Sequence, residues 1–409
     1  MASEGNSWRQ SKPANLLSLL TYYPVWGTLL SYLCLADFLV LFQVSKGIRR
    51  KLKDNLGRKC LNIDILLSNF VTHPDIFRSQ LGKHDALISG GFALNFFELS
   101  RWTVLNMDVF VPSGVHATEF TDYICKHEGY KASEEYSQEA ETGRGHFNFN
   151  SGKRPGKTLR VTVTDGPPIQ TILDSSYTTA SINFITWNKA YSIFPIQTVI
   201  HHKLYALKPM DEDFGSVLNE LSNQGWTTRD IIWPELAADA QSHEISGYRR
   251  VGDQSTLVIL LHTYNVQKAS TPDSVTEYAQ FEVSTNSVPP FFEQDRLPNT
   301  QIQLQRLVSP ALRYEYTFGK SSWHDFVSKR LQRWAWVELY KLEPGKRPLQ
   351  FTDGIPHYFN ISFLQDFQTP ETWDYADDQI PAWYLEWEQI TIDRSDRKGR
   401  SRHQGRHIL

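Results

Sequence analysis

The sequence predicts a protein of the α+β class, and three features lead to this prediction. The chain of 409 residues contains 40% hydrophobic and 13% aromatic residues, including 12 Trp, which is enough for a sizeable packed core. In its central part, short apolar runs with strand spacing alternate with segments of helical spacing. In its last third, strand-like segments precede a long helical one. This order of elements favours a mixed core with helical segments around it.

Charge, cysteine content and hydropathy exclude several classes of protein. The net charge of -3 argues against a globally basic surface for nucleic acid, although it allows a local basic patch. Cys34, Cys60 and Cys125 lie far apart without a CxxC motif, which indicates neither a disulfide framework nor a zinc site. We therefore expect a reducing compartment, the cytoplasm or the nucleus. The apolar run from Leu29 to Val44 has 16 residues, fewer than the roughly 20 of a membrane span, so we expect no membrane insertion.

The chain is expected to begin with a flexible segment, residues 1–22, followed by two helices within residues 23–60. Pro24 suits the first turn of the first helix. A second helix can begin at Ala36-Asp37, with apolar positions at Phe38, Leu41, Phe42 and Val44. The basic residues that follow suit the negative pole of that helix.

This N-terminal order resembles an F-box. The resemblance is carried by a Pro, a helix ending in "SYL", and "ADFLVLFQVSK" followed by basic residues. It implies that residues 23–52 dock on the adaptor of a cullin-type ubiquitin ligase. The alternative is a helical hairpin that only packs on the next domain.

The central domain, residues 61–267, is expected to alternate helices and strands. Gly90 and Gly91 form a tight turn between a strand and a helix, because glycine adopts such turns at low cost. In chain order we expect a helical pair broken near Pro74, a buried strand in "DALIS", the Gly-Gly turn, a helix in "FALNFFEL", a strand in "MDVFVP", a helix over 118–129, a surface loop over 128–146, a strand in "TLRVTVT", a short helix in "PIQTILDS", two strands around a turn at Trp187-Asn188, and a buried strand in "STLVILLHTYN".

The order of a strand, "SGG", a helix and a second strand with Asn106-Met107-Asp108 resembles the DNA polymerase β-type nucleotidyltransferase superfamily, in which the second strand carries Asp-x-Asp. More narrowly, "ALISGGFALNFFE", "INFITWNKAYSIFP" and "NQGWTTRDIIWPE" resemble a group of fungal nucleotidyltransferase-like proteins, often with an F-box-like start. The resemblance spans roughly residues 20–265. It implies a nucleotidyltransferase-like core with an F-box-like helical segment before it.

The resemblance also implies a site. The Gly-Gly turn lets the backbone approach a triphosphate, and the following helix N-terminus offers N–H groups, so Ser89, Gly90 and Gly91 are the expected nucleotide-binding residues. Carboxylates at positions i and i+2 of a strand share one face and can hold two Mg²⁺ ions for phosphoryl transfer. Asn106 and Asp108 occupy these two positions, and the superfamily has a third carboxylate on a neighbouring strand.

Asn106 departs from the pattern because an amide supplies no charge to Mg²⁺. Losing one preorganised electrostatic group typically costs on the order of 10²–10³ in rate. Candidates for the third acid are Asp165, which we expect to act in catalysis with Asp108, and Asp174. We expect an inactive or weakened transferase that recognises a nucleotide or a partner. The alternatives are an active Mg²⁺-dependent nucleotidyltransferase and an F-box substrate receptor that uses the fold as a scaffold.

Three other polar positions have plainer interpretations. Glu98 is expected to be a solvated residue at a helix end, and His201-His202-Lys203 a surface turn. Lys189 is expected to be an ordinary turn lysine, with phosphate binding as the alternative.

The last third is expected to form an α+β extension, residues 268–392, with a disordered basic tail at 393–409. Its most distinct segment is "SWHDFVSKRLQRWAWVELYKL", which has helical spacing. We expect this region to pack against the central domain or to bind a partner.

Overall fold

The computed structural model covers the whole chain of 409 residues. It describes residues 22, 24–25, 28, 32–47, 49–50, 61–138, 145–208, 211–227, 245–285, 300–348, 351 and 367–404.

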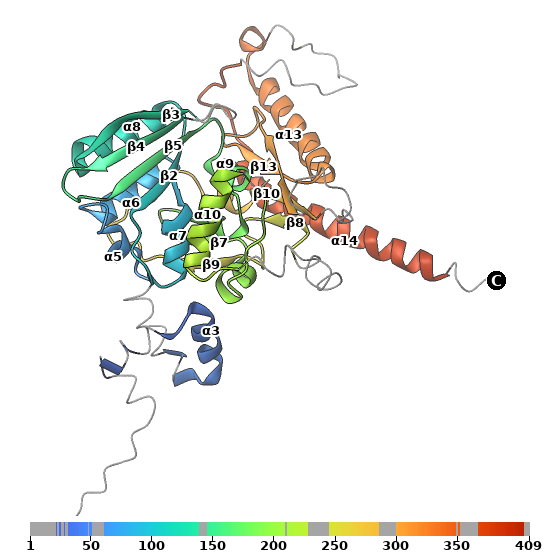
Figure 1. Ribbon diagram of the computed structural model, residues 1–409. Coiled ribbons are helices and arrows are strands. Elements are labelled where there is room, and N and C mark those ends of the chain that lie inside the picture. The colour runs from blue at the N-terminus through green and yellow to red at the C-terminus, as the bar shows by residue number, and fades with distance from the viewer. Residues whose placement is uncertain are drawn as a thin grey trace, which may run out of the picture.

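The centre of the molecule is a mixed eight-stranded sheet with the order β3-β4-β5-β2-β1-β6-β7-β9 (Figure 1). Strands β2 and β5 are parallel, and the other neighbouring pairs are antiparallel. The strands are β1 Leu87–Ser89, β2 Asn106–Pro112, β3 Tyr130–Gln138, β4 Gly145–Ser151, β5 Thr158–Thr164, β6 Asn183–Ile185, β7 Lys189–Ser192 and β9 Leu257–Leu260.

Each face of this sheet packs against different elements. Along β2, Met107, Val109 and Val111 point into one core, while Phe110 packs against another, as expected for alternating side chains. The first core also contains residues of α5 Ile63–Leu67, α6 Pro74–Lys83, α7 Gly90–Phe97, α8 Val115–Tyr123 and the π-helical turn η2 Ile124–Glu128. The second contains residues of α9 Pro168–Ser175 and of the C-terminal region.

A smaller group of helical elements packs beside α7. Leu94 of α7 contacts a cluster that includes Leu221 and Trp226. The helical elements of this group are the 3-10 turn η3 Thr179–Ser181, the π-helical turn η4 Ile196–Ile200 and the helix α10 Glu212–Asn223.

The N-terminal helix α3, Leu35–Val44, confirms the predicted second helix. Leu35 and Phe38 are buried in the first core, whereas Val40 and Val44 are each 63% exposed. The predicted first helix lies mostly outside the described residues. In the part of the chain that is described, no helix combines the length and the apolar character needed to cross a bilayer.

The C-terminal region builds its own core against the central sheet. Trp323 and Trp387 pack edge to face between the helices α13 and α14, which lie on the side of the molecule away from the β3–β4 hairpin (Figure 1). Its strand β10 pairs with β8 from the central region, so the two regions share a sheet. The elements are β8 Gly247–Arg250, α12 Asp273–Glu277, β10 Gln280–Thr285, β11 Thr300–Gln303, β12 Gln305–Leu307, β13 Tyr316–Phe318, α13 Ser321–Lys341, η7 Pro344–Lys346, η9 Asp377–Gln379 and α14 Ile380–Gln404.

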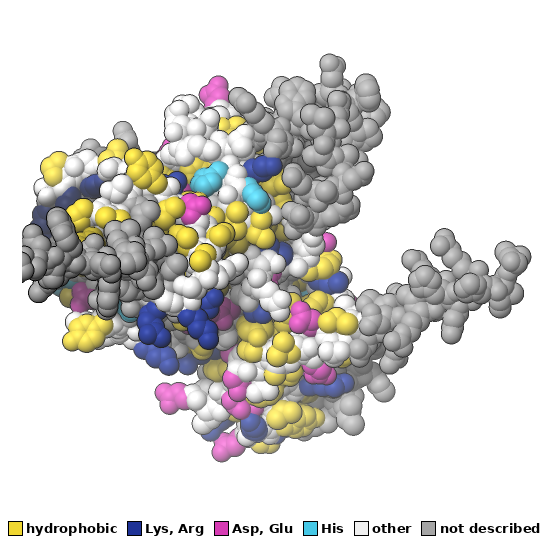
Figure 2. Space-filling view, turned by 90° about the horizontal axis from the view of Figure 1, so that it is seen from below, with side chains coloured by type: hydrophobic (Ala, Val, Ile, Leu, Met, Phe, Trp, Pro, Cys, Tyr) yellow, Lys and Arg dark blue, Asp and Glu magenta, His cyan; other side chains and the backbone are white. Residues whose placement is uncertain are grey.

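The structure confirms the predicted α+β class and many of the predicted elements. The helical pair broken at Pro74, the helix after Gly90-Gly91, the β6–β7 hairpin around Trp187-Asn188 and the long helix α13 all form. On the surface seen from below, Lys and Arg side chains gather in a group although the net charge is -3 (Figure 2). A local basic patch therefore exists despite the overall balance of charge.

Three expectations were wrong in detail. Residues 128–146 contain β3 and the start of β4 rather than only a loop, because a strand with one solvated face can carry many polar residues. Strand β9 was expected to be buried, but it lies at the sheet edge and Leu260 is 75% exposed. Helix α14 continues to Gln404, into the tail that was expected to be disordered.

Candidate functional site

The turn between β1 and α7 brings the backbone close to Asp108. Gly90 has a φ of +71°, and a Cβ atom added there would lie 2.6 Å from Asp108 Oδ2, so only glycine fits. The space around Gly91 is open, and the N-cap residue of α7 makes no side-chain capping bond. The Ser89 hydroxyl is buried and donates a hydrogen bond to the Asn183 carbonyl at 2.8 Å. The glycines, rather than the Ser89 side chain, therefore present this turn to a ligand.

The two positions predicted for metal ligands lie on the same side of β2. Asn106 is exposed and Asp108 is partly buried, and the residues between and beyond them point into the opposite core. Asp108 pairs in register with Ser89 of β1 on one side and with Arg160 of β5 on the other. We call Asn106, Asp108 and Arg160, together with the buried Ser89 beside Asp108, the polar face.

A cation stands beside Asp108 on the neighbouring strand. Arg160 Nη1 lies 3.3 Å from Asp108 Oδ1, and the Arg160 side chain is 46% exposed. Burial raises the pKa of the Asp108 carboxyl, while the charges of Arg160 and His146 act in the opposite direction. Glu220 of α10 also approaches Asp108 and raises its pKa. The Asp108–Arg160 ion pair is therefore the main electrostatic feature of the polar face.

Neither candidate for the third acid joins the polar face. Asp165 follows the end of β5, five positions beyond Arg160, which separates it from Asp108 by about 16 Å along the strand. The Asp165 side chain is exposed, and its carbonyl accepts a hydrogen bond from Arg306. Asp174 is exposed on α9, which packs on the core around Phe110. The predicted catalytic pair of Asp108 and Asp165 is therefore not brought together.

The residues of the polar face do not fit two Mg²⁺ ions. Such a site depends on several carboxylates, but here Asp108 is accompanied by the neutral Asn106 and the cationic Arg160. Within the described ranges, no group of three His, Cys, Asp or Glu side chains is arranged to hold a metal ion.

The sequence did not single out Arg160, although the alternation of apolar and polar residues along its strand indicated the face on which Arg160 lies. In "TLRVTVT" the apolar Leu159 and Val161 are buried in the first core, which directs Arg160 to the opposite face. What the sequence did not contain is the parallel pairing of β5 with β2, which sets Arg160 next to Asp108.

Glu98 and His202 also form a pair that was not predicted. Glu98 is only 2% exposed, and His202 Nε2 lies 3.2 Å from its Oε2 atom. Arg101 approaches the same oxygen at 3.8 Å, and the His202 ring lies against Trp226. The expected solvated helix end is therefore a buried contact between α7 and the chain after η4.

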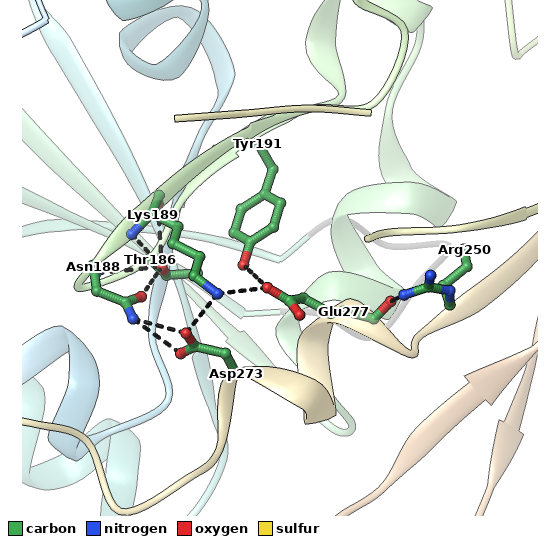
Figure 3. Close-up of polar contacts among 7 residues, drawn as sticks. All are labelled: Thr186, Asn188, Lys189, Tyr191, Arg250, Asp273 and Glu277. Carbon is green, nitrogen blue, oxygen red and sulfur yellow. Dashed lines mark hydrogen bonds and ion pairs between the residues drawn. The ribbon is translucent and has the colours of Figure 1, made fainter. Parts of the chain in front are cut away.

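A second polar cluster joins the central sheet to the C-terminal region (Figure 3). Lys189 Nζ lies 2.7 Å from Asp273 and 2.6 Å from Glu277, so it is an ion-paired lysine rather than a phosphate ligand. Tyr191 donates its hydroxyl proton to Glu277 at 3.1 Å, and the Asn188 amide donates to Asp273. These bonds fix α12 against the β6–β7 hairpin.

Comparisons with known proteins reveal little similarity. No protein-family model matches the chain, and no curated protein matches it. Solved structures of a CCA-adding enzyme share 16% sequence identity with this chain, with a TM-score of 0.27 for the complex with ATP and 0.25 for both the CTP complex and an apo form. Each match covers 36% of this chain, which spans 36%, 35% and 36% of the length of those structures. The interpretation of the polar face therefore depends on its own geometry.

Proposed function

We propose that the chain is a nucleotidyltransferase-like protein that binds a nucleotide at the polar face without catalysing two-metal transfer. The observation that carries this proposal is the ion pair between Asp108 and Arg160, 3.3 Å apart on adjacent strands. It places a positive charge where nucleotidyl transfer would need a carboxylate.

Two features support phosphate as the group that is recognised. The first N–H groups of α7 have no partner within the helix, and they follow the sharp Gly90 turn. The half-exposed guanidinium of Arg160 suits a phosphate oxygen because its planar fork can donate two hydrogen bonds. Phosphate would compete with Asp108 for this guanidinium. Because Arg160 would supply the positive charge, nucleotide binding would proceed without a metal ion.

Calorimetric titration with ATP tests this proposal, once in Mg²⁺ and once in EDTA, together with a transfer assay that uses labelled ATP. We expect the same affinity in both buffers, no labelled product, and about tenfold weaker binding for Arg160→Gln. The Arg330→Gln variant, whose side chain is partly exposed and pairs with Glu386 of α14, serves as the control and should bind as the parent does. Mg²⁺-dependent transfer that disappears in Asp108→Ala would instead support the active-enzyme alternative.

A specific observation also favours adaptor docking by the N-terminal helix. Tyr32, Val40 and Val44 are 79%, 63% and 63% exposed on or next to α3, so this helix presents apolar side chains to solvent. Leu33 and Leu41 instead pack against the first core. Substitutions at the exposed positions therefore separate docking from folding.

A pull-down with the ubiquitin ligase adaptor tests this second function. Capture of the parent chain that is lost in Val40→Asp, with an unchanged melting temperature, is the expected result. No capture of the parent chain would remove the docking function and leave a helix that only packs on the core.

A further inference from the structure

A cavity of about 270 Å³ lies between the central sheet and the C-terminal region, away from the polar face. Pro112 and Ser113 at the end of β2 line it, so it sits at the opposite end of that strand from Asn106. The other walls come from the end of α6, the segment from the end of β5 to the start of α9, the β6–β7 turn, the segment around α12 and the start of β13. Its size suits a small organic molecule.

Among the described residues, one carboxylate in this cavity, that of Asp85, forms no ion pair with a Lys or Arg side chain. Asp85 is partly buried, and its neighbours are the Thr271 hydroxyl, which hydrogen-bonds to it, and the His116 ring. Burial raises the pKa of Asp85. Its φ of +51° is a left-handed conformation that Asp tolerates and most residues avoid. The backbone is therefore held in a less common conformation where this carboxylate lines the cavity.

The other acids that line the cavity are already neutralised or exposed. Asp273 is held by Lys189 and Asn188, and Glu315 by Arg306 at 2.7 Å. Asp165 and Arg313, both exposed, line the same cavity with opposite charges. This leaves Asp85 as the partly buried carboxylate of the lining that forms no ion pair with a Lys or Arg among the described residues.

Four of the residues that line the cavity are aromatic. The hydroxyls of Tyr191 and Tyr316 donate to Glu277 and Asp377, so these residues offer the cavity their rings rather than free hydroxyl groups. Trp187 and Tyr314 also line it. Aromatic rings around a carboxylate attract an organic cation through both cation–π and ionic contacts.

We propose that this cavity binds a small molecule with a protonated amine and an apolar body, with Asp85 as the anion that pairs with the amine. This site is separate from the polar face and does not depend on the proposed nucleotide binding. Its aromatic walls would contact the apolar body of the ligand.

Titration of the full chain with 2-phenylethylamine and with its neutral isostere 2-phenylethanol tests the proposal. The amine should bind at least about tenfold more tightly than the alcohol, because only the amine pairs with the carboxylate. Equal affinities, or no binding of the amine, would overturn the proposal.

Two variants locate the effect at Asp85. Asp85→Asn and Asp85→Gly both remove the charge and both tolerate a positive φ, so the fold should survive in at least one. Each folded variant should lose at least about tenfold in affinity for the amine but not for the alcohol. The exposed Asp174→Asn variant is the matched control and should bind the amine as the parent does. Unchanged amine affinity in a folded Asp85 variant would contradict the assignment.

Discussion

The two ends of strand β2 carry polar groups in opposite surroundings. At its N-terminal end, Asp108 pairs with the half-exposed Arg160 on an open sheet face. At its C-terminal end, β2 meets a cavity lined by Asp85 and closed by the C-terminal region. The sequence motif points to the first end, whereas the second exists only because distant segments of the chain assemble there.

This difference teaches that the motif and the cavity have separate physical origins. The Gly-Gly turn and the positions of Asn106 and Asp108 on the polar face follow from local features, whereas Arg160 joins them through the pairing of β5 with β2. Asn106 and Arg160 are the two residues that make this face unsuited to metal ions. The cavity follows from long-range contacts such as the ion pairs between Lys189 and α12. Charges at the open end should therefore influence binding more than stability, and those at the closed end should influence both.

The largest change in the free energy of unfolding is expected from substitution of Arg78, which supports the cavity end of β2. Arg78 is 1% exposed, its Nε donates to the Trp187 carbonyl at 2.9 Å, and its Nη1 pairs with Asp64 at 3.0 Å. Arg78→Met removes both bonds and should lower the free energy of unfolding by about 2–4 kcal/mol. Urea denaturation measures this change. A loss no larger than that of Arg160→Gln would erase the contrast between the two ends.

Protonation of His84 should lower the stability of the protein at acid pH, and this residue lies at the same end. Burial, followed by the charge of Lys83, lowers the pKa of His84 to about 4, with Glu119 opposing this and His116 adding to it. A lowered histidine pKa means that stability is present above pH 6.5 and is lost as the pH falls toward 4. This loss approaches roughly 2–3 kcal/mol, and His84→Gln should lack it.

Urea denaturation from pH 7 to pH 4 measures this difference, with the exposed His127→Gln as the control. Parallel pH curves for the parent chain and His84→Gln would show that His84 does not titrate in this way.

Lys189 should show a smaller effect because its cluster is partly solvated. The Asp273 and Glu277 side chains are 29% and 27% exposed, so water can compensate part of the charge that Lys189→Met leaves unpaired. We expect a loss of about 1–3 kcal/mol in the free energy of unfolding. The exposed pair of Lys83 and Glu119 is the control, and Lys83→Met should leave the free energy of unfolding unchanged. A loss as small as that of the control would mean that the cluster does not hold α12.

The smallest effect on stability is expected at the open end. Arg160→Gln breaks a half-exposed ion pair and should change the free energy of unfolding by less than about 1 kcal/mol. Thermal unfolding measures this, and a much larger loss would indicate that Arg160 supports the fold rather than a ligand.

Local patterns in the sequence predicted the parts of the fold that depend on local spacing. The helix after Gly90-Gly91, the strand with Asn106 and Asp108, and the α13 helix all follow from periodicity and turn residues. The solvent exposure of a strand was harder to predict. Strand β9, for example, is as apolar as a buried strand but pairs with the sheet on one side only. Burial depends on which strands become neighbours, and periodicity does not encode this.

The candidate site was predicted only in part, for the same reason. Gly90, Asn106 and Asp108 do lie together, because one short segment carries them all. Asp165 is distant from Asp108 because the parallel register of β5 places Arg160 there instead. Glu98 is buried by His202, which comes from a segment about a hundred residues later. Such contacts are fixed by tertiary pairing rather than by local sequence.

The most direct test of the account is ATP affinity of the Asp108→Asn variant in EDTA, measured by calorimetry beside the parent chain. If Asp108 only competes with phosphate for Arg160, removing its charge should tighten ATP binding about three- to tenfold, equivalent to about 1 kcal/mol. If Asp108 instead holds Mg²⁺ for catalysis, the variant should gain no affinity in EDTA and should lose Mg²⁺-dependent binding. That second result would contradict the proposal that Arg160 and Asp108 form a metal-independent site.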